Sequence, residues 1–180
     1  MEEIQFARGL VPLLVFSAVL VLQKHRKTCD DAYVGQKHVG AGFLVQLISW
    51  FMIFVSSLLF SQLVIDAPSS IAMVLCFGVI TVAVYLIALQ QLSLRYFFND
   101  KHIAVTSMFA KTTRCFLSEV LNVTEKYYAS NGGGSTKVVR IQLKSKRIMI
   151  PISMLGGANI LDFERLLAQL KSRMIKDEVV

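Results

Sequence analysis

A short polar segment, residues 23–38, holds the side chains of this chain that most often do chemistry in proteins. His25, Cys29 and His38 are metal-ligand types, but their spacings of four and nine residues match no common zinc pattern. Asp30 and Asp31 form a carboxylate pair without a recognisable catalytic partner. We therefore expect no metal, no cofactor and no enzymatic activity. An enzyme would have to build its polar pocket from this segment.

A glycine-rich run at residues 131–135 is the other stretch that could serve a ligand. It lacks the Gly-Lys-Ser/Thr ending of a phosphate-binding P-loop, and no helical pattern follows it. The sequence also has no Gly-x-Ser-x-Gly elbow for a nucleophilic serine. We interpret the run as a flexible connection between two strands.

The second half of the chain is strongly basic. Fourteen Lys and Arg against seven Asp and Glu follow Leu94, whereas five of each precede it, so this half carries the whole net charge of +7. Such a charge favours an anionic partner, although a solvated basic surface is the alternative. The candidate surface for anionic lipid or a protein partner comprises Lys101, Lys111, Arg114, Arg140, Lys144, Lys146 and Arg147.

Three long apolar stretches occupy the first half of the chain. With 54% hydrophobic residues and a mean hydropathy of +0.57, the chain is more apolar than a typical soluble domain. A spanning helix needs about 20 apolar residues, and we predict three, at about residues 4–22, 39–65 and 67–92. A cleaved signal peptide is the alternative for the first stretch, but Glu2 and Glu3 replace the expected basic start. Residues 1–93 are therefore predicted to form a membrane domain.

Basic residues flanking these stretches predict their orientation. Lys24, Arg26, Lys27 and Lys37 precede the second stretch, whereas the link around Asp66 has no Lys or Arg. Because loops rich in Lys and Arg stay in the cytoplasm, we expect a multi-pass protein of the inner (cytoplasmic) cell membrane. Its N-terminus would lie outside and its C-terminal half inside.

Polar residues within the apolar stretches allow a second functional class, an accessory subunit of a transporter or channel. Gln46, Ser57 and Gln62 are examples, but no charged residue or histidine lies deep in any stretch. Because ion and proton paths usually need such groups, we interpret the polar residues as helix-packing contacts.

After Leu94 the periodicity changes to that of strands. Apolar and polar residues alternate at residues 102–107, 139–144 and 147–152, which predicts strands with one buried face. Further strands are predicted near residues 94–98, 111–117 and 121–128. An amphipathic helix follows at about residues 160–176, with Phe163, Leu166, Leu167, Leu170 and Met174 on one face. Residues 94–180 are thus predicted to form a second domain of about six antiparallel strands capped by a helix.

This order resembles the bacterial pleckstrin-homology-like (PH-like) domains that follow membrane spans in small bacterial proteins. The likeness is carried by residues 95–105, 116–123, 146–153 and 160–170. It implies a bent antiparallel sheet closed by the last helix, which serves as a binding or scaffolding module. The chain departs from the family in that its one tryptophan, Trp50, lies in a predicted span. The phosphoinositide-binding pattern of basic residues is also missing, so head-group binding is not carried over.

The predicted fold class is membrane α plus α+β, with three transmembrane helices followed by a small antiparallel PH-like β-domain and a C-terminal helix. The predicted function is a cytoplasmic binding or scaffolding module. Its expected partners are the lipid bilayer, anionic lipid head groups, a protein partner or a second copy of the chain. We expect no nucleic acid, because a membrane-tethered basic surface with few stacking aromatics suits it poorly.

Overall fold

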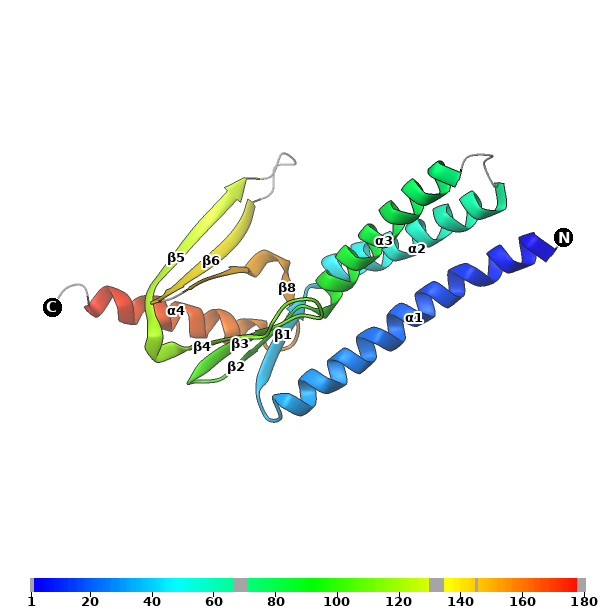
Figure 1. Cartoon of the computed structure of the whole chain (residues 1–180). Helices are drawn as coiled ribbons and strands as arrows, with labels where there is room; N and C mark the ends of the chain where they lie inside the picture. Colours follow the sequence, from blue (N-terminus) through cyan, green and yellow to red (C-terminus); the bar gives the residue numbers. More distant parts are fainter. Residues whose placement is uncertain (1, 67–70, 130–134, 145, 178–180) are drawn as a thin grey trace. The chain divides into compact units, whose positions relative to one another are not determined.

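The computed structural model describes residues 2–66, 71–129, 135–144 and 146–177. The chain divides into two compact units (Figure 1). A helical unit contains residues 1–32 and 44–93, and a strand-rich unit contains residues 33–43 and 94–180. The strand-rich unit is therefore assembled from two pieces of the chain that are separated by two helices.

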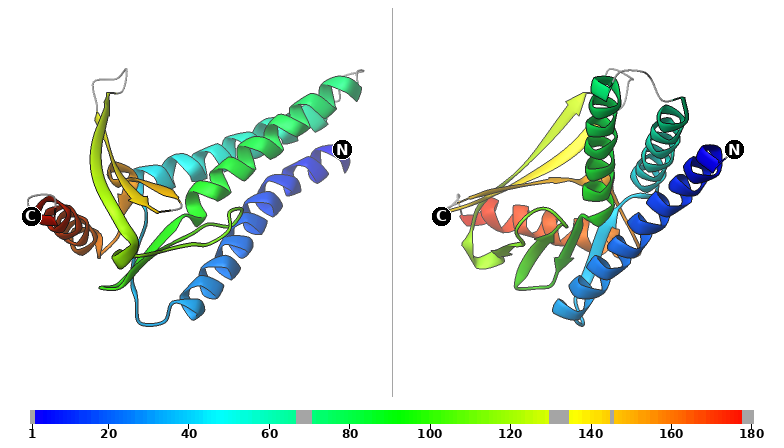
Figure 2. Two further views of the ribbon diagram at one scale, coloured as in Figure 1. Left: turned by 60° about the vertical axis from the view of Figure 1, so that its left-hand side comes forward. Right: turned by 45° about the vertical axis from the view of Figure 1, so that its right-hand side comes forward.

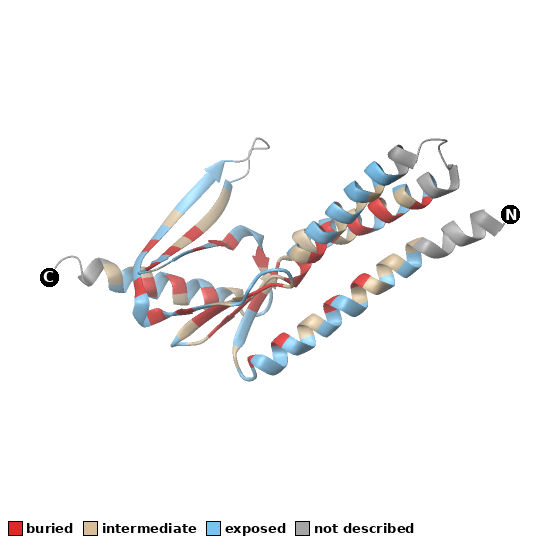
Figure 3. Ribbon diagram, viewed as in Figure 1, coloured by how far each residue is buried: buried red, intermediate tan, exposed pale blue. Residues whose placement is uncertain are grey.

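The helical unit consists of α1 (Glu2–Ala32), α2 (Phe43–Asp66) and α3 (Ile71–Ser93). Two of its helices are long and apolar enough to cross a membrane, over Phe43–Gln62 in α2 and Leu75–Ser93 in α3. Large apolar side chains such as Phe51, Leu59 and Val79 are exposed on them, and most of their surface is unburied (Figure 3). A core helix of a soluble protein would instead be largely covered.

The prediction of three membrane-spanning helices is wrong. In the described part of the chain α2 and α3 meet the criterion of length and apolarity, and α1 does not. The physical reason is that the apolar side chains of α1 give way at Gln23 to the charged residues predicted as a loop, and the helix continues without a break to Ala32. Arg8 interrupts the apolar run on its other side, so the uncharged residues 9–22 are fewer than the roughly 20 residues a span requires.

Helix α1 packs beside α3 through a polar contact between otherwise apolar surfaces. The Tyr85 hydroxyl donates to the Leu14 carbonyl at 2.9 Å, and it lies 3.0 Å from the Ser17 hydroxyl. Ser17 itself donates to Leu14 at 2.7 Å. The phenol is thus satisfied within the helical unit, as a buried or lipid-facing hydroxyl must be.

The strand-rich unit contains two antiparallel sheets. The five-stranded sheet has the order β4-β3-β2-β1-β8, and the three-stranded sheet has the order β5-β6-β7. Their bounds are β1 (Lys37–Ala41), β2 (Arg95–Phe98), β3 (His102–Thr106), β4 (Thr113–Phe116), β5 (Val120–Ala129), β6 (Ser135–Leu143), β7 (Arg147–Pro151) and β8 (Leu155–Gly156). The 3-10 turns Leu117–Glu119 and Ile152–Met154 connect them, and α4 (Ile160–Asp177) ends the unit. The β5–β6 hairpin is the longest and projects beyond the rest of the unit (Figure 2).

One hydrophobic core joins both sheets to α4. Buried residues alternate with more exposed ones along β6 and β7 (Figure 3). The core includes Val39, Tyr96, Phe98, Ile103, Cys115, Val123, Val139, Ile141, Ile148, Ile150, Phe163, Leu167 and Leu170. The helix presents its i, i+3, i+4 apolar face to this cluster, as its pattern predicted.

The predicted fold class is also wrong for the second half. Six strands lie where the sequence predicted them, but they do not make one six-stranded PH-like domain. Two further strands, β1 and β8, extend the first sheet to five strands, and the other three strands form a separate sheet. Strand β1 falls in residues that were assigned to a loop and to the start of the second span, because its short pattern ends at Gly42 and merges with the apolar run of α2.

Candidate functional site

The outward face of the three-stranded sheet carries a polar cavity. Strand pairing places Thr124 opposite Arg140, and Asn122 opposite Gln142, which in turn lies opposite Arg147. These five side chains alternate with the buried residues Val123, Val139, Ile141 and Ile148, so they share the face turned away from the core. They line a cavity of about 190 Å³, which we call the outer-face cavity.

Arg140 is held in position on this face by a neighbouring tyrosine. Its Nη2 donates a short hydrogen bond to the hydroxyl of Tyr128, which lies on the same face of β5. The Arg140 Nε is buried, and it has no hydrogen-bond partner in the described chain. A buried guanidinium N–H without an acceptor is costly, so this atom marks a place where a further acceptor would stabilise the structure.

The two arginines of the cavity have no acidic partner among the described residues. Glu125 lies on the opposite face of β5, where it pairs with Lys137 and Lys171 at 3.3 Å each. Partial burial opposes ionisation of Glu125, but hydrogen bonds from both lysines outweigh it and lower the pKa of the carboxyl. The positive charge of the outer-face cavity is therefore not neutralised from within the sheet.

A second basic group gathers where β4 meets the turn between β6 and β7. Lys146 Nζ donates to the Arg114 carbonyl at 2.9 Å. The Arg114 guanidinium lies 5.4 Å from the centre of the Tyr33 ring, and its Nε donates to the Tyr33 hydroxyl at 3.4 Å. Tyr33 stacks on Phe97 at 4.6 Å. The guanidinium of Arg114 thus interacts with an aromatic ring of the same unit, which leaves it less available to an external ligand.

Cys115 lies beside this group and is buried in the core. Burial raises the pKa of its thiol to about 11, although the nearby charge of Lys146 opposes the shift. The thiol is therefore protonated at neutral pH, and a protonated thiol is a poor nucleophile.

The structure divides the seven predicted surface residues. Arg140 and Arg147 share the outer-face cavity, and Arg114 and Lys146 share the second group. Lys144 is exposed at the end of β6. The other two are exposed at opposite ends of the β3–β4 pair, in the β2–β3 turn and before β4: Lys101 and Lys111. The predicted surface did not include Asn122, Thr124 and Gln142, although alternation along β5 and β6 places them on the same face as Arg140.

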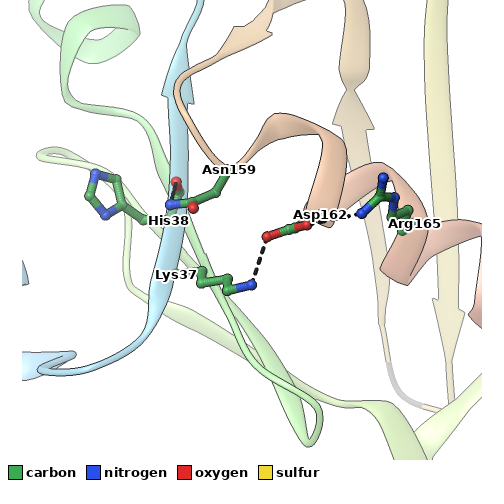
Figure 4. Close-up of polar contacts among 5 residues, drawn as sticks. All are labelled: Lys37, His38, Asn159, Asp162 and Arg165. Atoms are coloured by element: carbon green, nitrogen blue, oxygen red, sulfur yellow. Dashed lines mark hydrogen bonds and ion pairs between the residues drawn. The ribbon is translucent and has the colours of Figure 1, made fainter.

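Polar side chains connect strand β1 to the start of α4 (Figure 4). Lys37 Nζ lies 2.6 Å from Asp162 Oδ2, and the Asn159 side-chain amide donates to the His38 carbonyl at 3.2 Å. Arg165 also approaches Asp162, at 3.6 Å. The hydrogen bond and charge of Lys37 lower the pKa of Asp162. Because these polar groups bond to one another, we interpret the junction of β1 with α4 as structural rather than as a ligand site.

The polar segment of residues 23–38 is divided between the two units. His25 and Cys29 lie one turn apart on α1, with Nε2 and Sγ 3.6 Å apart, whereas His38 lies in β1 beside Phe97. Among the described residues, no three His, Cys, Asp or Glu side chains gather as metal ligands would. The predicted glycine loop falls outside the described residues, apart from Ser135.

Two serines of the apolar helix α2 form hydrogen bonds with the backbone of their own helix. Ser56 and Ser57 both donate to the Ile53 carbonyl, at 3.1 Å and 2.7 Å. Serine hydroxyls often bond in this way to the preceding turn, so both hydroxyls are satisfied within α2.

Two comparisons with known proteins give no assignment of function, so any assignment depends on the physical observations above. The chain matches no model of a protein family, and no curated protein sequence matches it at a significant level.

Proposed function

We propose that this chain is a membrane-anchored binding protein. In this proposal α2 and α3 form a hairpin that crosses the bilayer twice and carries the strand-rich unit at one membrane face. The strand-rich unit there binds an anionic partner, and the anionic lipid surface is the nearest one. The proposal combines two exposed apolar helices with basic side chains that lack acidic partners in the described part of the chain.

The pairing of β1 with β2 is the observation that supports a membrane anchor made of α2 and α3. Lys37 lies opposite Phe98, and Gly40 lies opposite Arg95. Strand β1 precedes α2, and β2 follows α3. Because strands of one sheet must share one aqueous compartment, the chain between Ala41 and Arg95 crosses the bilayer an even number of times. Two helices of spanning length satisfy this requirement.

Charge supports the cytoplasm as the compartment of the strand-rich unit. Lys37 and Arg95 flank the two helices on the sheet side, and the link between the helices, residues 67–70, carries no Lys or Arg. The positive-inside rule places the basic side in the cytoplasm. The predicted outside location of the N-terminus depended on a third crossing and loses its basis here.

Cysteine labelling in intact cells tests the anchor. Single cysteines at Val34, Lys144 and Ser69, in a chain whose native cysteines are replaced by alanine, are exposed to a membrane-impermeant maleimide. We expect Val34→Cys and Lys144→Cys to react only after the membrane is permeabilised, and Ser69→Cys to react at once. Labelling of Val34 and Lys144 from opposite sides would refute the hairpin, and so would extraction of the chain from membranes by alkaline carbonate.

A further inference from the structure

Two successive rows of paired residues build the outer-face cavity. One row contains Thr124 and Arg140, and the next contains Asn122, Gln142 and Arg147. Neighbouring strands lie about 4.8 Å apart, so the two guanidinium groups, one hydroxyl and two side-chain amides converge on one small volume. Every one of these side chains can donate a hydrogen bond, and none is acidic.

The chemistry of the lining suits an oxyanion. Guanidinium groups bind phosphate in a forked geometry with two parallel N–H donors. Arg140 already has one end of its fork fixed by Tyr128, and its Nε has no acceptor among the described residues. A side chain fixed before binding loses less freedom when a ligand arrives. Arg147 is exposed on the edge strand β7 and can move to complete the contact.

The size of the cavity limits what can occupy it. At about 190 Å³ it is smaller than the roughly 300–1,000 Å³ of sites that enclose whole drug-sized molecules. It therefore fits a single polar group and not an entire nucleotide or other large cofactor. The remainder of any ligand would lie outside, over the open face of the sheet.

We propose that the outer-face cavity binds one phosphoryl group, carried by a lipid head group or by a small soluble phosphate. The inference rests on the proposed binding role of the strand-rich unit and assigns it a ligand class and a site. Arg140 and Arg147 supply the charge, Thr124 donates its hydroxyl, and the Asn122 and Gln142 amides complete the donor set.

Calorimetric titration of the full chain, purified in detergent, tests the site. Inorganic phosphate and dioctanoyl phosphatidic acid are the two probes, with dioctanoyl phosphatidylcholine and chloride of equal ionic strength as references. The variants are Arg140→Gln, Arg147→Gln and Arg147→Lys. Lys126→Gln is the matched control, because it also removes one exposed positive charge from the outward face of the three-stranded sheet but does not line the cavity.

We expect saturable binding of at least one probe. Arg147→Gln should weaken it about tenfold, as loss of a charge-assisted hydrogen bond does, and Arg147→Lys should weaken it because the fork is lost. Lys126→Gln should leave binding unchanged. Binding of both probes or of inorganic phosphate alone supports a soluble ligand, and binding of phosphatidic acid alone supports a lipid head group.

The inference is overturned if neither probe binds saturably, or if Lys126→Gln weakens binding as much as Arg147→Gln, since diffuse charge would then explain the binding. Arg147 is exposed on an edge strand, so its variants keep the test valid if Arg140→Gln does not fold. These outcomes leave the membrane anchor untouched, because the anchor is judged by cysteine labelling and carbonate extraction.

Discussion

Phe163 joins α4 to strand β2 of the five-stranded sheet within the hydrophobic core. Its side chain is fully buried, and its ring centre lies 4.9 Å from that of Phe98 and 5.9 Å from that of Tyr96. Burial also raises the pKa of Tyr96 to about 12, so this phenol stays neutral at physiological pH. The ring cluster is therefore held by packing, without charge.

Replacing Phe163 by alanine should strongly destabilise the strand-rich unit. Removal of a buried aromatic ring typically costs about 3–5 kcal/mol, because both transfer energy and packing are lost. Leu161→Ala is the control, since that side chain is 63% exposed on the same helix. Thermal unfolding of the full chain in detergent measures both. Equal midpoints for the two variants would contradict the assigned core.

Glu125 should make stability depend on pH in the acid range. Its lowered pKa means that the folded state favours the carboxylate, so its contribution is present above the ordinary glutamate pKa of about 4.3 and is lost as pH falls below it. Glu125→Gln should reduce stability at pH 7 by about 0.5 kcal/mol and should cost little at pH 3. Unfolding midpoints at both pH values measure the difference.

Glu164→Gln provides the comparison for this prediction. Glu164 is exposed on α4 and makes no ion pair in the described residues. Its substitution should change the midpoint little at either pH. If Glu125→Gln also behaves in this way, the ion pairs of Glu125 with Lys137 and Lys171 contribute nothing measurable.

At the scale of elements, the pairing of β1 with β8 depends on two glycines that approach closely. A Cβ atom on Gly156 would lie 2.7 Å from the Gly42 Cα. The Gly42 amide also donates to the Met154 carbonyl at 2.8 Å. The backbones can therefore meet here only because both positions lack side chains.

Gly156→Ala should loosen this edge of the five-stranded sheet. The added methyl group would force the β8 backbone away from Gly42, because backbone atoms cannot move aside as a flexible side chain can. Gly40→Ala is the matched control, since its Cβ would meet its nearest neighbour, the Leu94 carbonyl oxygen, at an ordinary 3.6 Å. Hydrogen exchange of the β1 amides should accelerate in Gly156→Ala. Equal acceleration in Gly40→Ala would refute the close approach as its cause.

At the scale of the whole molecule, the strand-rich unit is not continuous in the sequence. A fragment of residues 94–180, the second domain that the sequence predicts, lacks β1 and so exposes the edge of β2. It also loses Val39 from the core and Lys37 from its contact with Asp162. We expect this fragment to aggregate or to unfold readily, because unpaired edges and an incomplete core favour association.

Restoring β1 should restore folding. Residues 33–42 joined to Leu94 through an Asn-Gly turn replace the two apolar helices by a short hairpin, which the antiparallel β1–β2 register allows. We expect this fusion to be soluble and monomeric and to unfold cooperatively in circular dichroism. If residues 94–180 alone fold equally well, β1 is dispensable and the sheet-based argument for an even number of crossings is weakened.

The sequence by itself determined the local elements. Period-two alternation located β3, β6 and β7, the i, i+3, i+4 pattern located α4, and uninterrupted apolar runs located α2 and α3. These signals are strong because burial of one face repeats at a fixed interval along each element. The alternation also exposed Arg140 and Arg147, two residues of the outer-face cavity.

Tertiary structure alone decided how the elements combine. Residues 37–41 became a strand because β2 and β8 offered hydrogen-bonding edges on both sides, and five residues ending in Gly-Ala carry too little pattern to show this. The division into two sheets depends on which strands pair. The placement of Thr124 opposite Arg140, and of Asn122 and Arg147 on either side of Gln142, depends on the register between β5, β6 and β7. Pairing energy is shared between both partners, so it cannot be read from either segment alone.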